Sequence, residues 1–253
     1  MITAVFLALL GAAAGSCAAL VAERLVRGDP IGMARSVCRS CGRQLRARDL
    51  VPLISFLALR GRCASCNARI PVLLVQAELA GAALGGGAAL VAPDPLRALL
   101  LAVWIWSLLA LAIADLRYYR LPDPLVLTAG VLGIALMLAG DGTGWPPLGD
   151  RILSAALGAL AGGGSFWLIR AGYHWRTGRD GMGLGDVKLM AALGAALGLE
   201  RLPIMVLLAA LSALLLALLR AWRKGRSLHR LGRVPFGAAL AMAAALVALI
   251  TQT

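Results

Sequence analysis

Long apolar runs separated by short polar segments fill most of this 253-residue sequence. Most of the runs reach the roughly 20 residues that an α-helix needs to cross the hydrocarbon core of a bilayer. They cover residues 2–22, 70–92, 96–116, 122–140, 151–170, 185–200, 202–220 and 233–251. The pattern predicts an all-α, polytopic membrane bundle of about eight transmembrane helices, or of seven if the short sixth run joins the seventh.

Basic residues are distributed unequally between the segments that flank these runs. If the first run crosses from outside to inside, 22 of the 25 Lys and Arg residues fall on the inner side. Cytoplasmic loops of membrane proteins carry such an excess of positive charge. The net charge of +13 therefore indicates topology, with both termini outside, and contact with the lipid bilayer. It does not indicate a nucleic-acid partner, because no motif for one accompanies it.

Four of the five cysteines lie in the one long polar segment, residues 23–69. They form two C-x-x-C pairs, Cys38–Cys41 and Cys63–Cys66. Two such pairs are typical of a structural zinc site, in which four thiolates leave no open position for water. Two alternatives stay open. An iron–sulfur cluster also uses four cysteines, and a quinone-linked oxidoreductase uses paired thiols, although disulfide chemistry belongs on the oxidising side of a membrane.

A glycine-rich hexapeptide, residues 181–186, places the carboxylate of Asp186 at the start of the sixth run. A carboxylate at a membrane helix is costly and indicates a functional site; the alternative is a turn in which Asp186 caps the helix. Asp115 ends the third run. Since the third run points inward and the sixth outward, we expect both acids at the cytoplasmic boundary of the membrane.

Two neighbouring carboxylates share one proton, because both cannot ionise cheaply at short range. The ionised group activates water, and the protonated group polarises a carbonyl and then protonates the leaving amine. This chemistry predicts an aspartic peptidase with Asp115 and Asp186 as catalytic residues. Because helix dipoles favour an anion at a helix N-terminus, we expect Asp186 to be the base and Asp115, near a helix C-terminus, the acid.

These motifs together resemble the prepilin peptidases, or type IV leader peptidases, of the GxGD class of membrane aspartyl proteases. Gly183-Leu184-Gly185-Asp186 matches the motif that names the class. Residues 114–123 resemble the segment with the other catalytic aspartate, the cysteine loop resembles the family's zinc-binding domain, and residues 234–237 match a stretch before the last helix. Further motif residues are Gly183, Gly185, Lys188 and Asp123. The resemblance covers nearly the whole chain.

The resemblance implies cleavage of the basic leader from type IV prepilins or pseudopilins, on the cytoplasmic side of the bacterial inner membrane. Many members also methylate the new N-terminus with S-adenosylmethionine; Ala19 stands where members usually carry Asn, which bears on that second activity. We therefore expect a first transmembrane helix at 1–22, a cytoplasmic zinc-binding loop at 23–69 and a transmembrane protease core at 70–253. On the inner face, Asp49, Asp123 and Asp180 are the candidate partners for a basic leader.

Two other functions remain compatible with the sequence. One is a non-catalytic membrane scaffold of a pilus or secretion assembly, which would use the zinc loop to bind a partner. The other is the quinone-linked thiol oxidoreductase. Replacement of either aspartate separates the peptidase from the scaffold, because only a peptidase needs the carboxylates.

Overall fold

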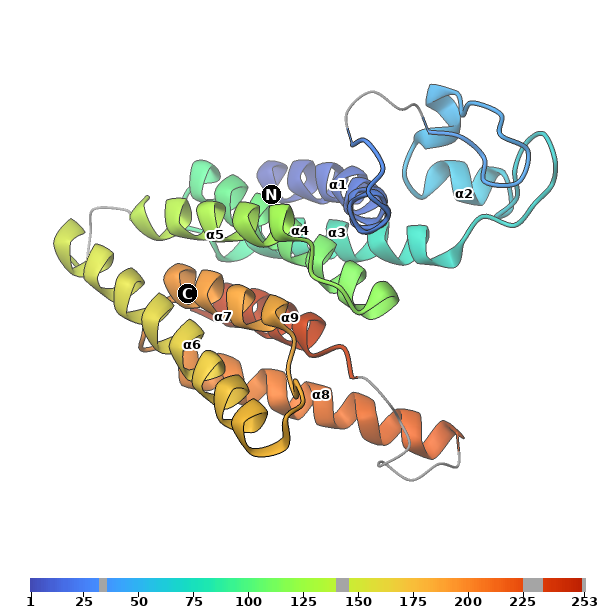
Figure 1. The fold of residues 1–253 in the computed structure, drawn as a ribbon. Helices are drawn as coiled ribbons and strands as arrows, with labels where there is room; N and C mark the ends of the chain where they lie inside the picture. Colours follow the sequence, from blue (N-terminus) through green and yellow to red (C-terminus); the bar gives the residue numbers. More distant parts are fainter. Residues whose placement is uncertain (32–35, 140–145, 225–233, 252–253) are drawn as a thin grey trace. The chain divides into compact units, whose positions relative to one another are not determined.

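The computed structural model describes residues 1–31, 36–139, 146–224 and 234–251 (Figure 1). Within these residues each of the eight apolar runs forms one α-helix. The helices are α1 (Ile2–Arg27), α3 (Val72–Val91), α4 (Pro95–Tyr118), α5 (Asp123–Leu138), α6 (Leu148–Thr177), α7 (Leu184–Leu197), α8 (Leu202–Lys224) and α9 (Phe236–Ile250). The polar segment adds a short 3-10 helix, η1 (Ala47–Leu50), and α2 (Ile54–Ala58). The prediction of an all-α fold is confirmed.

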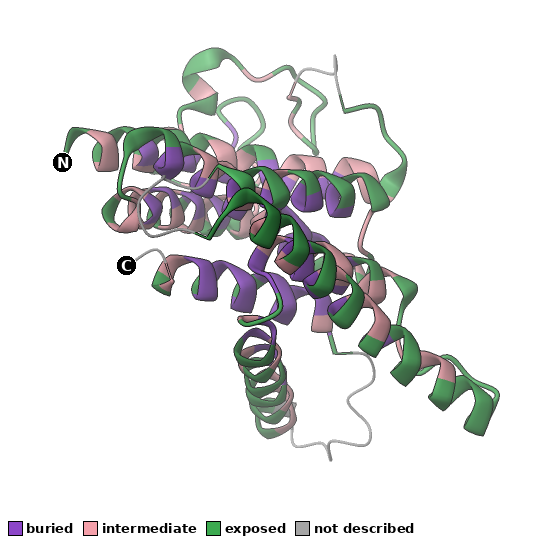
Figure 2. Ribbon diagram, turned by 90° about the vertical axis from the view of Figure 1, so that its left-hand side faces the viewer, coloured by how far each residue is buried: buried purple, intermediate pink, exposed green. Residues whose placement is uncertain are grey.

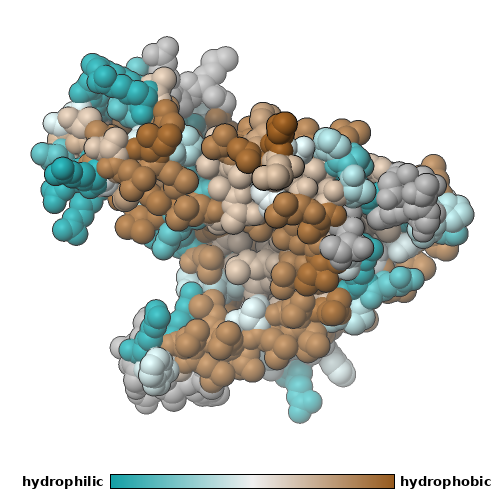
Figure 3. All heavy atoms as spheres, turned by 180° about the vertical axis from the view of Figure 1, so that it is seen from behind, coloured by the Kyte–Doolittle hydropathy of each residue, from teal (hydrophilic) through white to brown (hydrophobic). Residues whose placement is uncertain are grey.

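Five of these helices, α1, α3, α4, α6 and α8, are long and apolar enough to cross a membrane. The other three, α5, α7 and α9, have 16, 14 and 15 residues. Hydrophobic residues cover large areas of the exposed helix surface (Figure 3). Such surfaces suit contact with lipid, so the chain is a multi-pass membrane protein. The eight predicted spans match eight helices, of which five meet the length of a full span.

The chain divides into two compact units, Met1–Ala110 and Leu111–Thr253. Helix α4 runs through the boundary between them. Helix α1 continues beyond its predicted end at residue 22 and stops at Gly28, whose φ of 77° is left-handed and closes the helix. Residues 225–233, which carry three of the 22 basic residues expected on the inner side, lie outside the described residues. The sequence-based division at residues 22 and 69 remains a prediction.

Glycines bring α1 and α3 together in the first unit, where the two helices lie side by side (Figure 1). A Cβ atom added at Gly15 would overlap the carbonyl group of Ala77, and one at Gly81 would overlap that of Gly11. Small residues allow such close backbone contact between membrane helices. The Trp106 Nε1–H of α4 donates a hydrogen bond of 3.0 Å to the Gly81 carbonyl, which fixes α4 against the same pair.

Helix α7 is the centre of the second unit, because it packs against α5, α6 and α9. The backbones of α6 and α7 touch at Gly158 and Gly194, where a Cβ on either glycine would overlap the carbonyl of the other. Most residues of α9 are buried (Figure 2). Helix α9 is therefore largely enclosed in protein, and the first turns of α7 and α9 position the carboxylates described below.

Replacing Gly194 with Ala should lower the stability of the second unit by about 1–3 kcal/mol, because the added methyl group must force two backbones apart. Gly164→Ala is the matched control: it lies on α6 with no atom within 4 Å of an added Cβ. That change should be neutral or stabilising by about 0.5–1 kcal/mol, the ordinary gain when Ala replaces a helical Gly. Thermal unfolding in detergent micelles measures both. Equal effects would contradict the close approach.

Candidate active site and candidate metal centre

Asp115 lies near the end of α4 and is buried, with 6% of its surface exposed. Its Oδ2 accepts a hydrogen bond of 2.8 Å from the backbone N–H of Ala238, in the first turn of α9. This N–H is one of the four that an α-helix leaves without a partner at its start. A carboxylate of one helix is thus held by the N-terminus of another.

Asp186 lies in the first turn of α7 and is half-buried. The helix begins after Gly183, which is its N-cap, and the Asp186 N–H donates to the Gly183 carbonyl at 3.2 Å. The glycine-rich segment therefore ends in a helix start that carries the carboxylate, as the sequence predicts. Asp186 is in the first turn of α7, Asp115 is held by the first turn of α9, and these two helices pack against each other.

The structure changes the argument for acid and base roles. Helix ends predict Asp186 as the anion, since it begins a helix while Asp115 ends one. In the structure Asp115 also faces a helix N-terminus, that of α9, through the Ala238 N–H. Both carboxylates therefore receive the stabilisation that a helix start gives to an anion. Helix dipoles do not distinguish the two roles, and the assignment of base and acid stays a prediction.

The Leu121 side chain lies close to the helix starts that are next to the two aspartates. A Cβ added at Gly185 would lie 3.1 Å from Leu121 Cβ, and one at Gly237 would lie 2.7 Å from Leu121 Cδ1 and 3.2 Å from Asp115 Oδ2. The Leu121 side chain therefore occupies the space that these two glycines leave free. Glycine at both positions lets α7 and α9 approach the same side chain without a clash.

Lys188 and Asp123 form an ion pair between α7 and the start of α5. The Lys188 Nζ lies 2.8 Å from both carboxylate oxygens of Asp123. Both side chains are more than half exposed, so the pair contributes little to stability, about 0–1 kcal/mol. Lys188 follows Asp186 by two residues, so the pair aligns the first turn of α7 with α5.

The last two turns of α6 hold the loop that leads to Asp186. Arg170 pairs with Asp180 at 2.8 Å and also donates to the Met182 carbonyl. The Asp180 carboxylate lies 3.2 Å from His174 Nδ1. A Cβ at Gly181 would lie 2.6 Å from the Tyr173 ring, so only glycine lets the loop pass so close. Successive loop residues are thus fixed to one helix end.

The four cysteines of the polar segment come together. Their Sγ atoms all lie within 4.8 Å of one another. The two C-x-x-C turns share one geometry: the first cysteine donates its N–H to the residue five positions later, and the residue four positions later has a left-handed φ. These bonds are Cys38 N–H to Arg43 O and Cys63 N–H to Ala68 O, and the left-handed residues are Gly42 and Asn67.

The cluster has the dimensions of a metal site. Four sulfurs at about 2.3 Å from a tetrahedral zinc lie about 3.8 Å from one another. The Sγ atoms of Cys38 and Cys66 are 3.8 Å apart. The donor set, four thiols on two tight turns, thus fits a metal ion that prefers sulfur. The cysteines converge on one point and do not pair in twos.

The thiols of Cys63 and Cys66 differ in pKa. Backbone N–H groups of Cys66 and Ser65 lower the pKa of Cys63 to about 6. The Ala68 N–H lowers the pKa of Cys66, but burial and the side chains of Cys41, Cys63 and Cys38 together raise it to about 11. The negative charge of one thiolate thus hinders ionisation of the next thiol. A cation bound between the four sulfur atoms would remove this hindrance, because coordination deprotonates a thiol outright.

Sequence reasoning missed several of these contacts. The three acids expected to meet a basic leader already have partners: Lys188 for Asp123, Arg170 for Asp180, and the Arg46 N–H for Asp49 at 3.1 Å. Glu78, which lies in the apolar run 70–92, accepts a hydrogen bond of 2.9 Å from the Leu53 N–H. Its only signal in the sequence is a carboxylate within an apolar run.

Comparison with known proteins identifies the family of this chain. Residues 9–91 match the family model described as the bacterial peptidase A24 N-terminal domain, and residues 102–218 match that of the type IV leader peptidase family. Among curated relatives named prepilin leader peptidase/N-methyltransferase, that of Pseudomonas putida is 36% identical over 208 residues, which are 82% of this chain and 69% of the relative. That of Neisseria gonorrhoeae is 40% identical over 197 residues, 76% of this chain and 64% of the relative. No solved structure gives a significant match.

Fold and sites define a class of protein, a multi-pass helical membrane protein with a carboxylate pair and a tetracysteine loop. Within that class, the matches cover both units of the chain. The chain belongs to the type IV leader peptidase family.

Proposed function

We propose that this protein is a membrane aspartic endopeptidase that removes the leader peptide of type IV prepilins or pseudopilins. The catalytic residues are Asp115 and Asp186. The observation that carries this proposal is the placement of the two acids: Asp115 is buried and held by the first turn of α9, Asp186 is half-buried in the first turn of α7, and Leu121 lies against both helix starts. The relatives named prepilin leader peptidase/N-methyltransferase supply the substrate class.

The mechanism uses one proton shared between the two carboxylates. The ionised carboxylate takes a proton from water, which attacks the scissile carbonyl. The protonated carboxylate donates a hydrogen bond to the carbonyl oxygen and then protonates the leaving amine. The Ala238 N–H holds one Asp115 oxygen, so the other oxygen is left to carry the reaction. Gly183 and Gly185 shape the helix start, and Lys188 with Asp123 aligns it.

The tetracysteine loop is proposed to hold one structural zinc ion through Cys38, Cys41, Cys63 and Cys66. The ion would cross-link two turns of a segment that has only short helices of its own. The excess of basic residues supports placing this loop and the active site on the cytoplasmic side of the bacterial inner membrane. A second activity, N-methylation of the new N-terminus with S-adenosylmethionine, is proposed from the relatives' name.

The test is cleavage of a prepilin-like substrate by membranes that contain this protein. The substrate carries a basic leader before an apolar helix. We expect a shorter product whose new N-terminus starts the apolar helix, as mass spectrometry would show. A substrate that stays intact with abundant, folded protein, across both pilin and pseudopilin sequences, would count against the peptidase and in favour of a scaffold.

Arg170 should act as a positioning residue for this cleavage. Arg170→Gln breaks its contacts with Asp180 and Met182, so the loop before Asp186 loses its hold on α6. Because a misplacement of about 1 Å costs on the order of 100-fold in rate, we expect kcat to fall between about 10- and 100-fold with little change in KM. Initial-rate kinetics in detergent measure both constants.

Two comparisons make this test specific. Arg176→Gln removes an equal charge from the last turn of α6 at an exposed position, and it should leave kcat unchanged. Arg170→Lys keeps the charge and should recover part of the rate. A change in KM alone would show that Arg170 binds substrate and does not position Asp186.

A further inference from the structure

An open pocket of about 400 Å³ lies at the C-terminal end of α6, within the second unit. Figure 1 shows this end of α6 leading into the loop before α7. The side chains that line the pocket are two indoles, an imidazole, a guanidinium, a methyl group and a carboxylate: Trp167, Trp175, His174, Arg170, Ala171 and Asp180. Such a wall suits a ligand that carries charge and has an apolar part.

The length of α6 places this pocket at the depth of lipid headgroups. Its 30 residues span about 45 Å at 1.5 Å per residue, whereas the hydrocarbon core of a bilayer is about 30 Å thick. After Arg151 the helix carries no charged residue until Arg170. With the uncharged stretch in the hydrocarbon, the last two turns lie among the headgroups, where Trp is enriched. Trp175 there is 91% exposed.

Charges of both signs meet in the pocket. Asp180 pairs with Arg170 at 2.8 Å and lies 3.2 Å from His174 Nδ1. A carboxylate has about four acceptor positions, and the Asp180 side chain is 54% exposed, so it can accept further N–H groups. Two exposed arginines, Arg176 and Arg179, lie next to the pocket in the sequence. Within the described part of the chain, neither of them has an ion-pair partner.

These groups match a zwitterionic headgroup better than an anionic one. A phosphate is complementary to guanidinium groups, and an arginine has five N–H donors, more than the contacts of Arg170 with Asp180 and Met182 require. The carboxylate of Asp180 would repel a purely anionic ligand but accepts the N–H donors of an ammonium group. The indole face of Trp175 attracts the same positive charge.

We infer that this pocket binds the phosphoethanolamine headgroup of a membrane lipid, phosphatidylethanolamine. Its ammonium group lies at Asp180 and its phosphate at the arginines of this helix end. The acyl chains lie along the exposed apolar surface of α6, to which Leu160 and Trp167 belong. Phosphatidylglycerol lacks the ammonium group, and phosphatidylcholine has an ammonium group without N–H donors, so the pocket distinguishes the three headgroups.

The test is native mass spectrometry of the purified full-length protein, with its metal retained, during titration with lipids that share the same acyl chains. We expect one phosphatidylethanolamine per chain, bound at least about 10-fold more tightly than phosphatidylglycerol or phosphatidylcholine, the difference that a hydrogen bond between charged groups makes. The N-methyl and N,N-dimethyl lipids should have intermediate affinities, because each methyl group removes one N–H donor. This series uses the wild-type protein, so it does not depend on the folding of a variant.

Two substitutions locate the bound lipid. Asp180→Asn keeps the side-chain shape and removes the charge, so it should weaken phosphatidylethanolamine binding by about 10-fold. Its matched control, Asp150→Asn, removes an exposed acid at the other end of α6 and should change nothing. Trp175→Leu should weaken binding several-fold. Trp222→Leu, which removes a Trp that is 82% exposed on α8, should leave it unchanged.

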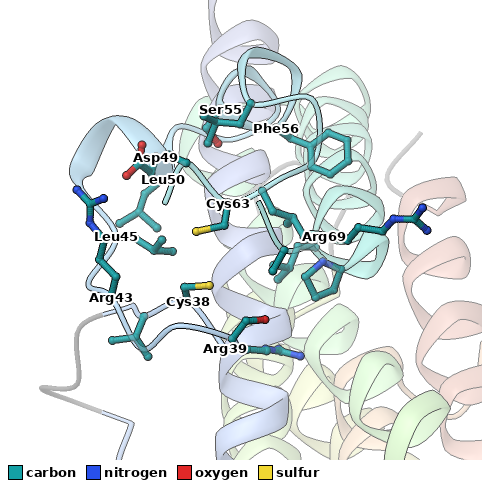
Figure 4. Close-up of a pocket in the computed structure, with 18 of the residues that line it drawn as sticks. Cys38, Arg39, Arg43, Leu45, Asp49, Leu50, Ser55, Phe56, Cys63 and Arg69 are labelled. Atoms are coloured by element: carbon teal, nitrogen blue, oxygen red, sulfur yellow. The ribbon is translucent and has the colours of Figure 1, made fainter. Parts of the chain in front are cut away.

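Other outcomes would overturn the assignment. Equal affinity for the three headgroups, or selectivity that survives Asp180→Asn, would do so. The cavity beside the cysteine turns also has basic residues in its lining, among them Arg69 (Figure 4). Lipid binding that is lost on Arg69→Gln and kept in Trp175→Leu would move the site there. Free phosphoethanolamine that binds as tightly as the lipid would show that the pocket takes a soluble ligand.

The bound lipid has a consequence for the active site, which rests on the proposed peptidase function. Arg170 and Asp180 also fix the loop that leads to Asp186. A headgroup held by Asp180 therefore holds the same loop, and prepilin cleavage should be several-fold faster in nanodiscs with phosphatidylethanolamine than in nanodiscs without it. Selective binding without any cleavage would count against the peptidase and leave the lipid site in place, so the two failures are distinguishable.

Discussion

Asp115→Asn and Asp186→Asn should each reduce prepilin cleavage by about 10⁴-fold or more, the scale seen when one member of a catalytic unit is removed. Asn has the shape of Asp but neither accepts a proton from water nor donates one to an amine. In the Asp115→Asn protein the new side-chain amide turns its oxygen toward the Ala238 N–H, so this hydrogen bond and the packing around it are kept. Cleavage in membranes, with protein abundance measured alongside, tests both changes.

Asp150→Asn is the matched control, because Asp150 is an exposed acid in the first turn of α6. It should cleave at the wild-type rate. Because the two aspartates act as one unit, the double variant should be no slower than either single variant. Cleavage above a few per cent of wild type in one single variant would remove that carboxylate from the mechanism. Additive losses would show two independent roles.

Cys63→Ser, or removal of metal by a strong chelator, should unfold the polar loop between residues 37 and 69. Apparent binding free energies of structural zinc in small peptides are about 10–16 kcal/mol, which is as large as the whole stability of a typical domain. Apart from the cysteines, the regular structure of the loop consists of two isolated bridges and two short helices. Hydrogen exchange of its backbone amides should rise to the rate of an open chain, while α6 and α7 stay protected.

Cys17→Ser is the matched control for this change, since Cys17 lies on α1 outside the cluster. It should keep one bound metal and wild-type exchange. Metal analysis of the purified protein gives the stoichiometry, for which we expect one zinc. Iron in place of zinc would correct the identity of the metal. Disulfides between the four cysteines in the cell would instead support a thiol oxidoreductase.

The sequence predicts most of the helices, because apolar length is a strong local signal. All eight runs fold as helices with ends shifted by a few residues, as at α1, where the polar Arg24 and Arg27 still belong to the helix. The tetracysteine cluster and the position of Asp186 at a helix start could also be predicted from the sequence, because residues that are close together in the sequence form these turns. Asp115 could be singled out from the sequence because it ends an apolar run and lies in a motif.

Contacts between distant segments could not be predicted from the sequence in this way. The Ala238 N–H that holds Asp115 is 123 positions away in the sequence. Nothing in the local pattern of α9 marks that N–H as a partner, since every helix starts with free N–H groups. The same holds for Glu78 and Leu53, and for Arg170, whose charge in the sequence served only as a sign of topology.

The shortness of α7 affects the lipid around the second unit. At 1.5 Å per residue, its 14 residues span about 21 Å, and α5 and α9 span about 24 and 22 Å. The hydrocarbon core of a bilayer is about 30 Å thick. Short helices are accommodated by local thinning of the bilayer. Thinned lipid brings headgroups and water nearer to the aspartates, so the hydrolytic water has a short path to an otherwise apolar site, and acyl-chain length becomes a determinant of turnover.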